Sequence, residues 1–238
     1  MRSLKWLAAG VIYSLVQVSP AAAAPQTPTT TTKPTTTATH AMNEAGPHSE
    51  AAFMLKQDMR KLWTDHVVWT RDYIIAAVGD QPDATAAANR LMKNQEDIGK
   101  AVAKYYGDSA GQQLTTLLKE HISIAVDLIK AAKAGDKAAQ QQADSRWQQN
   151  AVQIADFLSK ANPNWPRATL VDLMKGHLST TTDEVVARLK KDWDGDVKAF
   201  DAVYEHILKM SDALADGIVK QFPDKFGARP TATTGARR

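Results

Sequence analysis

The chain has 238 residues, 44% hydrophobic and 23% charged, which is enough for one domain with a sizeable core. It contains no cysteine, so disulfide frameworks, thiolate metal sites, c-type haem attachment and cysteine nucleophiles are all excluded. The formal charge is +3, with 29 basic and 26 acidic residues. No basic nucleic-acid-binding face is expected, because five of the basic residues lie in the terminal segments: Arg2, Lys5, Arg229, Arg237 and Arg238.

Residues 1–23 are predicted to be a secretory signal peptide. Arg2 and Lys5 supply the positive end, residues 6–18 form an apolar stretch, and small residues allow cleavage after Ala23. The apolar stretch is shorter than the roughly 20 residues that span a bilayer. We therefore expect an exported protein, periplasmic or extracellular, without a transmembrane anchor after cleavage.

Two segments of biased composition flank the expected folded domain. Residues 24–49 are rich in Thr, Pro and Ala, which predicts a flexible spacer, because such residues cannot bury a core. Residues 227–238 are similar and are predicted to be a disordered tail. The domain itself is expected over residues 50–226.

The pattern between residues 50 and 226 is helical throughout. Apolar residues recur at spacings of three and four, and no window alternates at period two for long enough to form a strand. The sequence predicts an all-α bundle of about six helices, each of roughly 20 to 30 residues. The expected breaks are residues 79–82, 106–108, 135–136 and 162–166.

An internal repeat of about 55 residues organises this helical region. Leu62, His66, Asp72, Ile74 and Ala77 recur 55 residues later, and Arg90, Asn94 and Ile98 recur 56 residues later. A third, weaker copy begins at His177. The repeated unit is predicted to be an antiparallel helical hairpin, used two or three times, whose copies pack on one another.

Polar residues interrupt the apolar stripe of each hairpin. His66 and Asn94 lie at similar distances from their turn, as do His121 and Asn150, so the four side chains are expected in one central layer. Neutral imidazole is a good ligand for a first-row transition metal or haem iron. The metal candidates are His66, His121, His177 and His206, and the ligand-binding candidates are Asn94, Asp97 and Asn150.

Three interpretations of this layer remain open at this stage. It could hold a metal or haem, it could line a pocket for another small ligand, or its His–Asn pairs could only fix packing. The last would make the protein a structural or interaction module, with an envelope protein as its partner. The sequence lacks the motifs of di-iron bundles, zinc proteases, serine hydrolases and nucleotide-binding enzymes, so a non-enzymatic module is favoured. The acidic run at residues 192–196 is interpreted as a turn or helix cap rather than a calcium loop.

The helical region also resembles a family of uncharacterised, exported bacterial proteins. The resemblance implies an all-helical fold, and His66, Asn94, Asp97, His121 and His177 match the family pattern. Similar sequences carry glycosyltransferase or acetylglutamate kinase labels, which nothing in this sequence supports. The resemblance lies in Leu62-Trp63-x2-His66-Val67-x-Trp69-Thr70-Arg71, Asn94-x2-Asp97-Ile98-Gly99, Tyr105-Tyr106-Gly107, Glu120-His121, Lys130-Ala131-x-Lys133-Ala134-Gly135, Asn162-Pro163-x-Trp165 and Gly217-Ile218-Val219-Lys220-Gln221-Phe222-Pro223.

Overall fold

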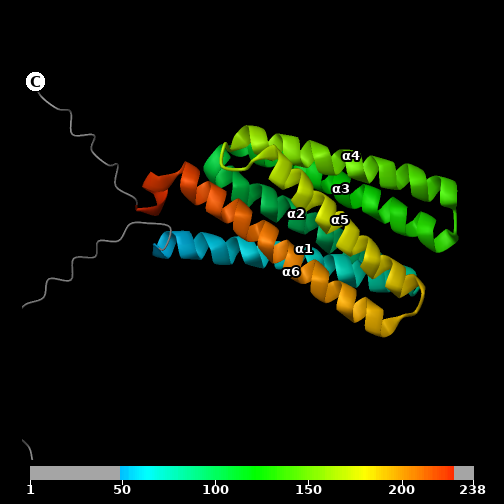
Figure 1. The fold of residues 1–238 in the computed structure, drawn as a ribbon. Coiled ribbons are helices and arrows are strands. Elements are labelled where there is room, and N and C mark those ends of the chain that lie inside the picture. The colour runs from blue at the N-terminus through cyan, green and yellow to red at the C-terminus, as the bar shows by residue number, and fades with distance from the viewer. Residues whose placement is uncertain (1–48, 228–238) are drawn as a thin grey trace, which may run out of the picture. The chain divides into compact units, whose positions relative to one another are not determined.

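The protein is described by a computed structural model, which defines residues 49–227. The all-α prediction is confirmed, and no strand occurs within these residues (Figure 1). The predicted signal peptide, and nearly all of the predicted spacer and tail, lie outside them. The elements are α1 (Glu50–Val78), α2 (Ala84–Tyr106), α3 (Asp108–Ala134), α4 (Lys137–Ala161), α5 (Arg167–Leu189), α6 (Trp193–Gln221) and a short 3-10 helix, η1 (Pro223–Phe226).

Side-chain caps define the start of three helices. The hydroxyl of Ser49 accepts from the amide of Ala52 at the start of α1, and the carboxylate of Asp136 accepts from Ala139 at the start of α4. Asp192 does the same for Gly195 at the start of α6. Each cap satisfies an amide that the helix itself leaves unpaired. The interpretation of residues 192–196 as a cap is therefore confirmed.

The start of α6 has a capping residue in the sequence, but the turn before it has no glycine or proline signal. The chain turns between α5 and α6 at residues 190–192, a segment that contains neither glycine nor proline. Lys191 adopts a left-handed backbone conformation there, with a φ of 60°. The left-handed region is unusual for a residue with a Cβ, so composition alone did not predict this break.

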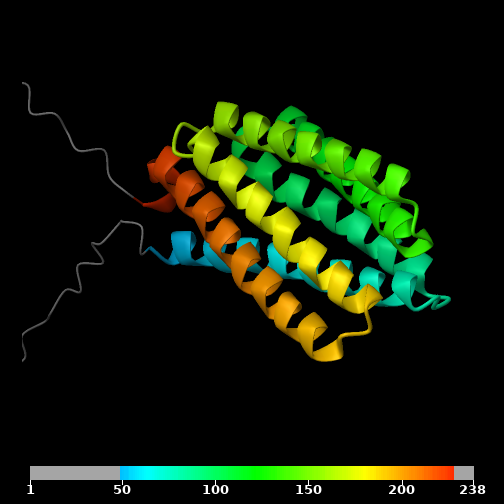
Figure 2. The ribbon, with the colours of Figure 1, turned by 45° about the vertical axis from the view of Figure 1, so that its right-hand side comes forward.

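The six helices form three antiparallel hairpins, as the repeat predicts (Figure 2). Each helix packs against its neighbours in sequence, and α6 returns to pack against α1, which closes the bundle. The hairpins are α1–α2, α3–α4 and α5–α6. None of the helices within residues 49–227 is both long and apolar enough to cross a membrane.

Equivalent hydrogen bonds show that the repeat extends into the second helix of the third hairpin. The side-chain amide of Asn94 donates to the carbonyl of Leu62, and that of Asn150 donates to the carbonyl of Leu117. In the third hairpin the Nε2 of His206 donates to the carbonyl of Leu173 over 2.7 Å. His206 thus takes the position that asparagine holds in the first two copies.

Gly176 makes room for this larger side chain. A Cβ on Gly176 would lie 2.6 Å from Cε1 of His206, whereas the equivalent positions of the other hairpins carry Asp65 and Glu120. We expect Gly176→Ala to destabilise the protein by about 1–3 kcal/mol through overpacking.

The matched control is the same substitution in a His206→Asn background, which resembles the first two hairpins. Urea unfolding of the four proteins of this double-mutant cycle should show a much smaller cost for Gly176→Ala when asparagine is present. An equal cost in both backgrounds would contradict this account of Gly176.

The core is divided into two apolar clusters. The larger one runs through all six helices and includes Met59, Ile98, Ile154 and Ile207. The smaller one consists of Tyr73, Ile74, Ala87, Ile129 and Val185, near the turns of the three hairpins. The buried histidines and their amide partners belong to neither cluster.

Candidate functional site: a histidine pocket

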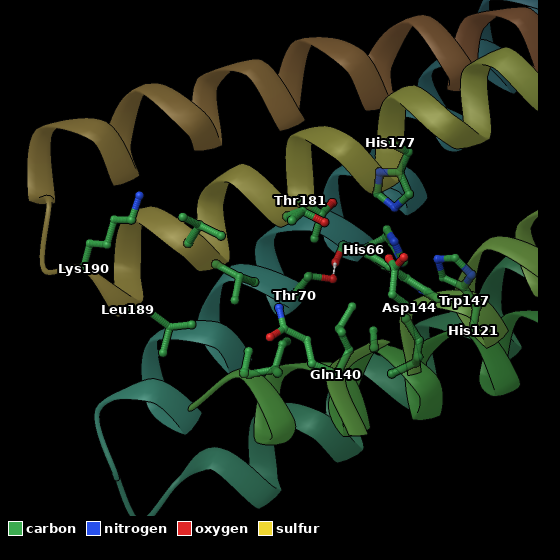
Figure 3. A pocket seen from close by; sticks show the side chains of 18 of the residues that line it. His66, Thr70, His121, Gln140, Asp144, Trp147, His177, Thr181, Leu189 and Lys190 are labelled. Carbon is green, nitrogen blue, oxygen red and sulfur yellow. Dashed lines mark hydrogen bonds between the residues drawn. The ribbon is translucent and has the colours of Figure 1, made fainter. Parts of the chain in front are cut away.

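A cavity of about 260 Å³ lies among α1, α3, α4 and α5. Its inner end is formed by His66, His121 and His177, and Lys190 lies at the opposite end (Figure 3). We call this cavity the histidine pocket. Its walls are mainly apolar, from Ile122, Ala125, Leu128, Ile129, Ala132, Val185, Val186 and Leu189, and its remaining lining residues are Thr70, Lys137, Gln140, Asp144, Trp147, Thr181 and Thr182.

The three hairpins contribute one histidine each to the pocket. His66 comes from α1, His121 from α3 and His177 from α5. The ring of His177 lies between the others, with centroids 5.5 Å from that of His66 and 6.2 Å from that of His121. The central layer predicted from the repeat therefore forms, and His177 belongs to it.

Amide side chains hold two of these rings. The Nδ1 of His121 lies 2.8 Å from the Oδ1 of Asn150, two residues that the hairpin geometry predicted to share one layer. In the first hairpin the contact comes instead from Gln95, whose Nε2 lies 3.3 Å from the Nδ1 of His66. Gln95 also donates to the carbonyl of Leu91, and Asn94 lies beside it. Both amides are fully buried, so they fix ring orientation rather than meet solvent.

The third ring has no such partner. In the α5–α6 hairpin His206 replaces the asparagine and bonds to the carbonyl of Leu173, so it does not reach His177. Within residues 49–227 the Nδ1 of His177 is buried without a hydrogen bond, as are the Nε2 of His121 and the hydroxyl of Thr181. Buried polar atoms are normally paired. Four residues that line this one cavity, His121, Trp147, His177 and Thr181, each have an unpaired one, which marks the cavity as a candidate binding site.

Burial keeps the histidines uncharged. It lowers the pKa of His66 to about 3 and that of His121 to about 4, because a buried imidazolium loses its hydration. The pKa of His177 is also well below the usual value, through burial and the neighbouring rings. The pocket therefore presents neutral imidazoles at physiological pH.

Two predicted site residues lie apart from the pocket. Asp97 is partly exposed on α2 and lies 3.8 Å from the ammonium group of Lys93. His206 is half-buried against α5, where it stands in for an asparagine. Asn94 and Asn150 support the pocket through backbone carbonyls and His121 without lining it.

Within residues 49–227, no three histidine or acidic side chains are arranged to hold a metal ion.

The volume of the cavity limits the size of a ligand that it can hold. It exceeds the roughly 150 Å³ of an apolar cavity that binds benzene, and it falls below the roughly 300 Å³ at which pockets for drug-sized ligands begin. This volume suits a substituted benzene ring rather than haem.

Comparison with protein-family models, with curated protein sequences and with solved structures finds no match to this chain. The histidine pocket is therefore interpreted from its own residues.

A buried ion-pair network beside the pocket had no counterpart in the sequence analysis. Arg71 on α1 donates to Glu184 on α5 over 2.8 Å and to Asp196 on α6 over 2.9 Å. Arg188 also reaches Asp196, over 3.2 Å. Both carboxylates are almost fully buried. The partners are 113 and 125 residues apart in the chain, so no local pattern could have paired them.

The unequal bonding of the histidines predicts unequal effects of leucine substitution. His121→Leu leaves the Oδ1 of Asn150 buried without a partner, which is expected to cost about 1–3 kcal/mol. His177→Leu removes a ring whose Nδ1 has no partner, so stability should stay within about 1 kcal/mol of the wild type or rise. Urea unfolding at pH 7 measures both. Equal losses would contradict the bonding described here.

Proposed function

We propose that the protein is a non-enzymatic binding module that holds a small, largely apolar molecule in the histidine pocket. One observation carries the proposal: His121 and His177 line a cavity whose walls are otherwise mainly aliphatic, and each has a buried nitrogen without a hydrogen-bond partner among residues 49–227. A ligand with an apolar body would fill the cavity, and its polar group would satisfy the imidazoles. Small-molecule sites commonly combine apolar walls with a few placed polar groups.

The proposal is tested by thermal unfolding of protein purified without a histidine tag. Small alkylated benzenes are expected to raise the melting temperature, because a ligand that binds only the folded state stabilises it by about 3 kcal/mol at a hundredfold excess over Kd. Ala125→Leu fills the pocket and should abolish the increase. Ala138→Leu makes the same change at an exposed position of α4 and should leave the increase intact.

Two other results would overturn this function. An increase with Zn, Cu, Ni, Fe or haem, together with stoichiometric metal or a Soret band and no response to the alkylated benzenes, would support a metal or haem centre at His66, His121 and His177. No response to any of these additions would leave packing as the role of the histidine layer, in a structural or interaction module of the envelope.

We further propose that the module acts outside the cytoplasm. The support is the positive, apolar and small-residue order of residues 1–23. N-terminal sequencing of the mature protein should begin at about Ala24. A mature chain that begins at Met1 or Arg2 would contradict export by this route.

A further inference from the structure

We infer that the ligand of the histidine pocket is an uncharged hydroxyl compound, an alkylphenol-like molecule that donates a hydrogen bond to Nε2 of His121 and accepts one from the indole of Trp147. This inference rests on the proposed function and specifies the chemistry of the same pocket. The inference depends on the tautomer of His121, that is, on which of its two ring nitrogens carries the hydrogen.

The hydrogen bonds of Asn150 determine the tautomer of His121. The carbonyl oxygen of Leu117 can only accept, so the amide atom that lies 3.1 Å from it is the NH2 group of Asn150. The Oδ1 of Asn150 therefore faces His121, and the Nδ1 that lies 2.8 Å from it must be the donor. In a neutral imidazole only one nitrogen carries a proton. The Nε2 of His121 is thus a bare acceptor.

This acceptor has no partner within the described part of the chain, and neither has the donor next to it. The Nε2 of His121 and the Nε1 of Trp147 are both buried without hydrogen bonds. The two rings are adjacent, with centroids 5.2 Å apart, and both residues line the pocket. Indole can only donate, so two neighbouring rings of the pocket lining carry one unpaired acceptor and one unpaired donor.

Among simple polar groups, a hydroxyl matches this pair best, because it donates and accepts through one atom. A carboxylate can only accept, so it would place a lone pair against that of His121. An ammonium group can only donate, so it would leave the indole unpaired and bury a charge. The aliphatic walls and the volume of about 260 Å³ favour an alkylated ring as the body of the ligand.

The test compares three molecules of similar size by calorimetry on the full chain at pH 7: 4-ethylphenol, 4-ethyltoluene and 4-methylbenzoate. The phenol is expected to bind at least about tenfold more tightly than the toluene, in which a methyl replaces the hydroxyl and both buried groups stay unpaired. The benzoate is expected to bind most weakly. His206→Asn, outside the pocket, should keep this order, whereas His121→Leu should remove the preference for the phenol.

A measurement on the wild type tests the same inference without relying on a variant. In protein labelled with 15N at histidine, the resonance of the unprotonated Nε2 of His121 should move on addition of 4-ethylphenol and stay in place with 4-ethyltoluene. Equal affinity for phenol and toluene, or preference for the benzoate, would overturn the hydroxyl inference while leaving a ligand pocket in place. No binding of any of the three would overturn the proposed function as well.

Discussion

Acidification from pH 7 to pH 5 is expected to lower the free energy of unfolding by about 3–4 kcal/mol, the net of several proton-binding terms. In the unfolded chain histidine binds a proton near pH 6.5, but in the folded protein burial holds the pKa of His66 at about 3 and that of His121 at about 4. Below pH 6.5 the unfolded state therefore binds protons that the folded state does not. Each of these two histidines costs about 2 kcal/mol by pH 5.

Two further groups affect the free energy of unfolding between pH 7 and pH 5. His177 adds to the loss, since burial lowers its pKa as well. Glu184 opposes it, because burial raises the pKa of this carboxyl to about 7, so the folded state gains a proton first as the pH falls. The contribution of Glu184 is roughly that of one histidine with the opposite sign, and the balance remains a loss.

Urea unfolding at the two pH values, at constant ionic strength, measures this dependence. His177→Leu is the matched control, because it removes one buried titrating group and should reduce the loss between pH 7 and pH 5. Equal stability at the two pH values would mean that the histidine layer is not buried in neutral form.

Arg71→Met is expected to destabilise the protein by about 3–5 kcal/mol, because it breaks a buried ion-pair network and removes the hydrogen-bond partner of Glu184. Arg71 is the only group that bonds to Glu184 within the described residues, and it also binds Asp196 through both terminal nitrogens. Its guanidinium lies 4.6 Å from the ring centre of Phe200, which holds it over the α5–α6 hairpin. Methionine fills similar space, but it leaves Asp196 with Arg188 as its remaining partner and leaves Glu184 with none among the described residues.

An exposed pair provides the control. Arg146 binds Asp127 over 3.0 Å, but both side chains are about half exposed. Arg146→Met should cost no more than about 1 kcal/mol, because solvent screens such pairs. Chemical unfolding of both variants at pH 7 gives the comparison. Similar costs for the two substitutions would contradict a special role for the buried network.

The repeat explains why much of the fold and part of the site could be predicted. His66 and His121 interrupt otherwise apolar stripes at equivalent positions, so their meeting in one layer follows from helical rise and antiparallel pairing. The repeat length of about 55 residues also placed His177 at the equivalent position of the third hairpin. The proximity of His121 and Asn150 could be predicted for the same reason, because both residues lie at similar distances from one turn.

Features that depend on a single copy of the repeat could not be predicted. Arg71 and Glu184 occupy positions that carry other residue types in the remaining hairpins, so repetition gives no signal for their pairing. His206 was a candidate metal ligand, but its ring bonds to the backbone carbonyl of Leu173 in the place of an asparagine, which Gly176 permits. The pocket itself arises from how three hairpins pack, and no single stripe of residues encodes that volume.

The central claim, that the histidine pocket binds a small apolar molecule, is tested most directly by methyl NMR. In protein labelled at isoleucine and valine methyl groups, addition of 4-ethylphenol should shift Ile122, Ile129 and Val185, which line the pocket. Ile207 and Ile218, buried elsewhere in the core, serve as internal controls and should not move. Pocket resonances that stay unchanged up to millimolar ligand, or that shift no more than the controls, would contradict the claim.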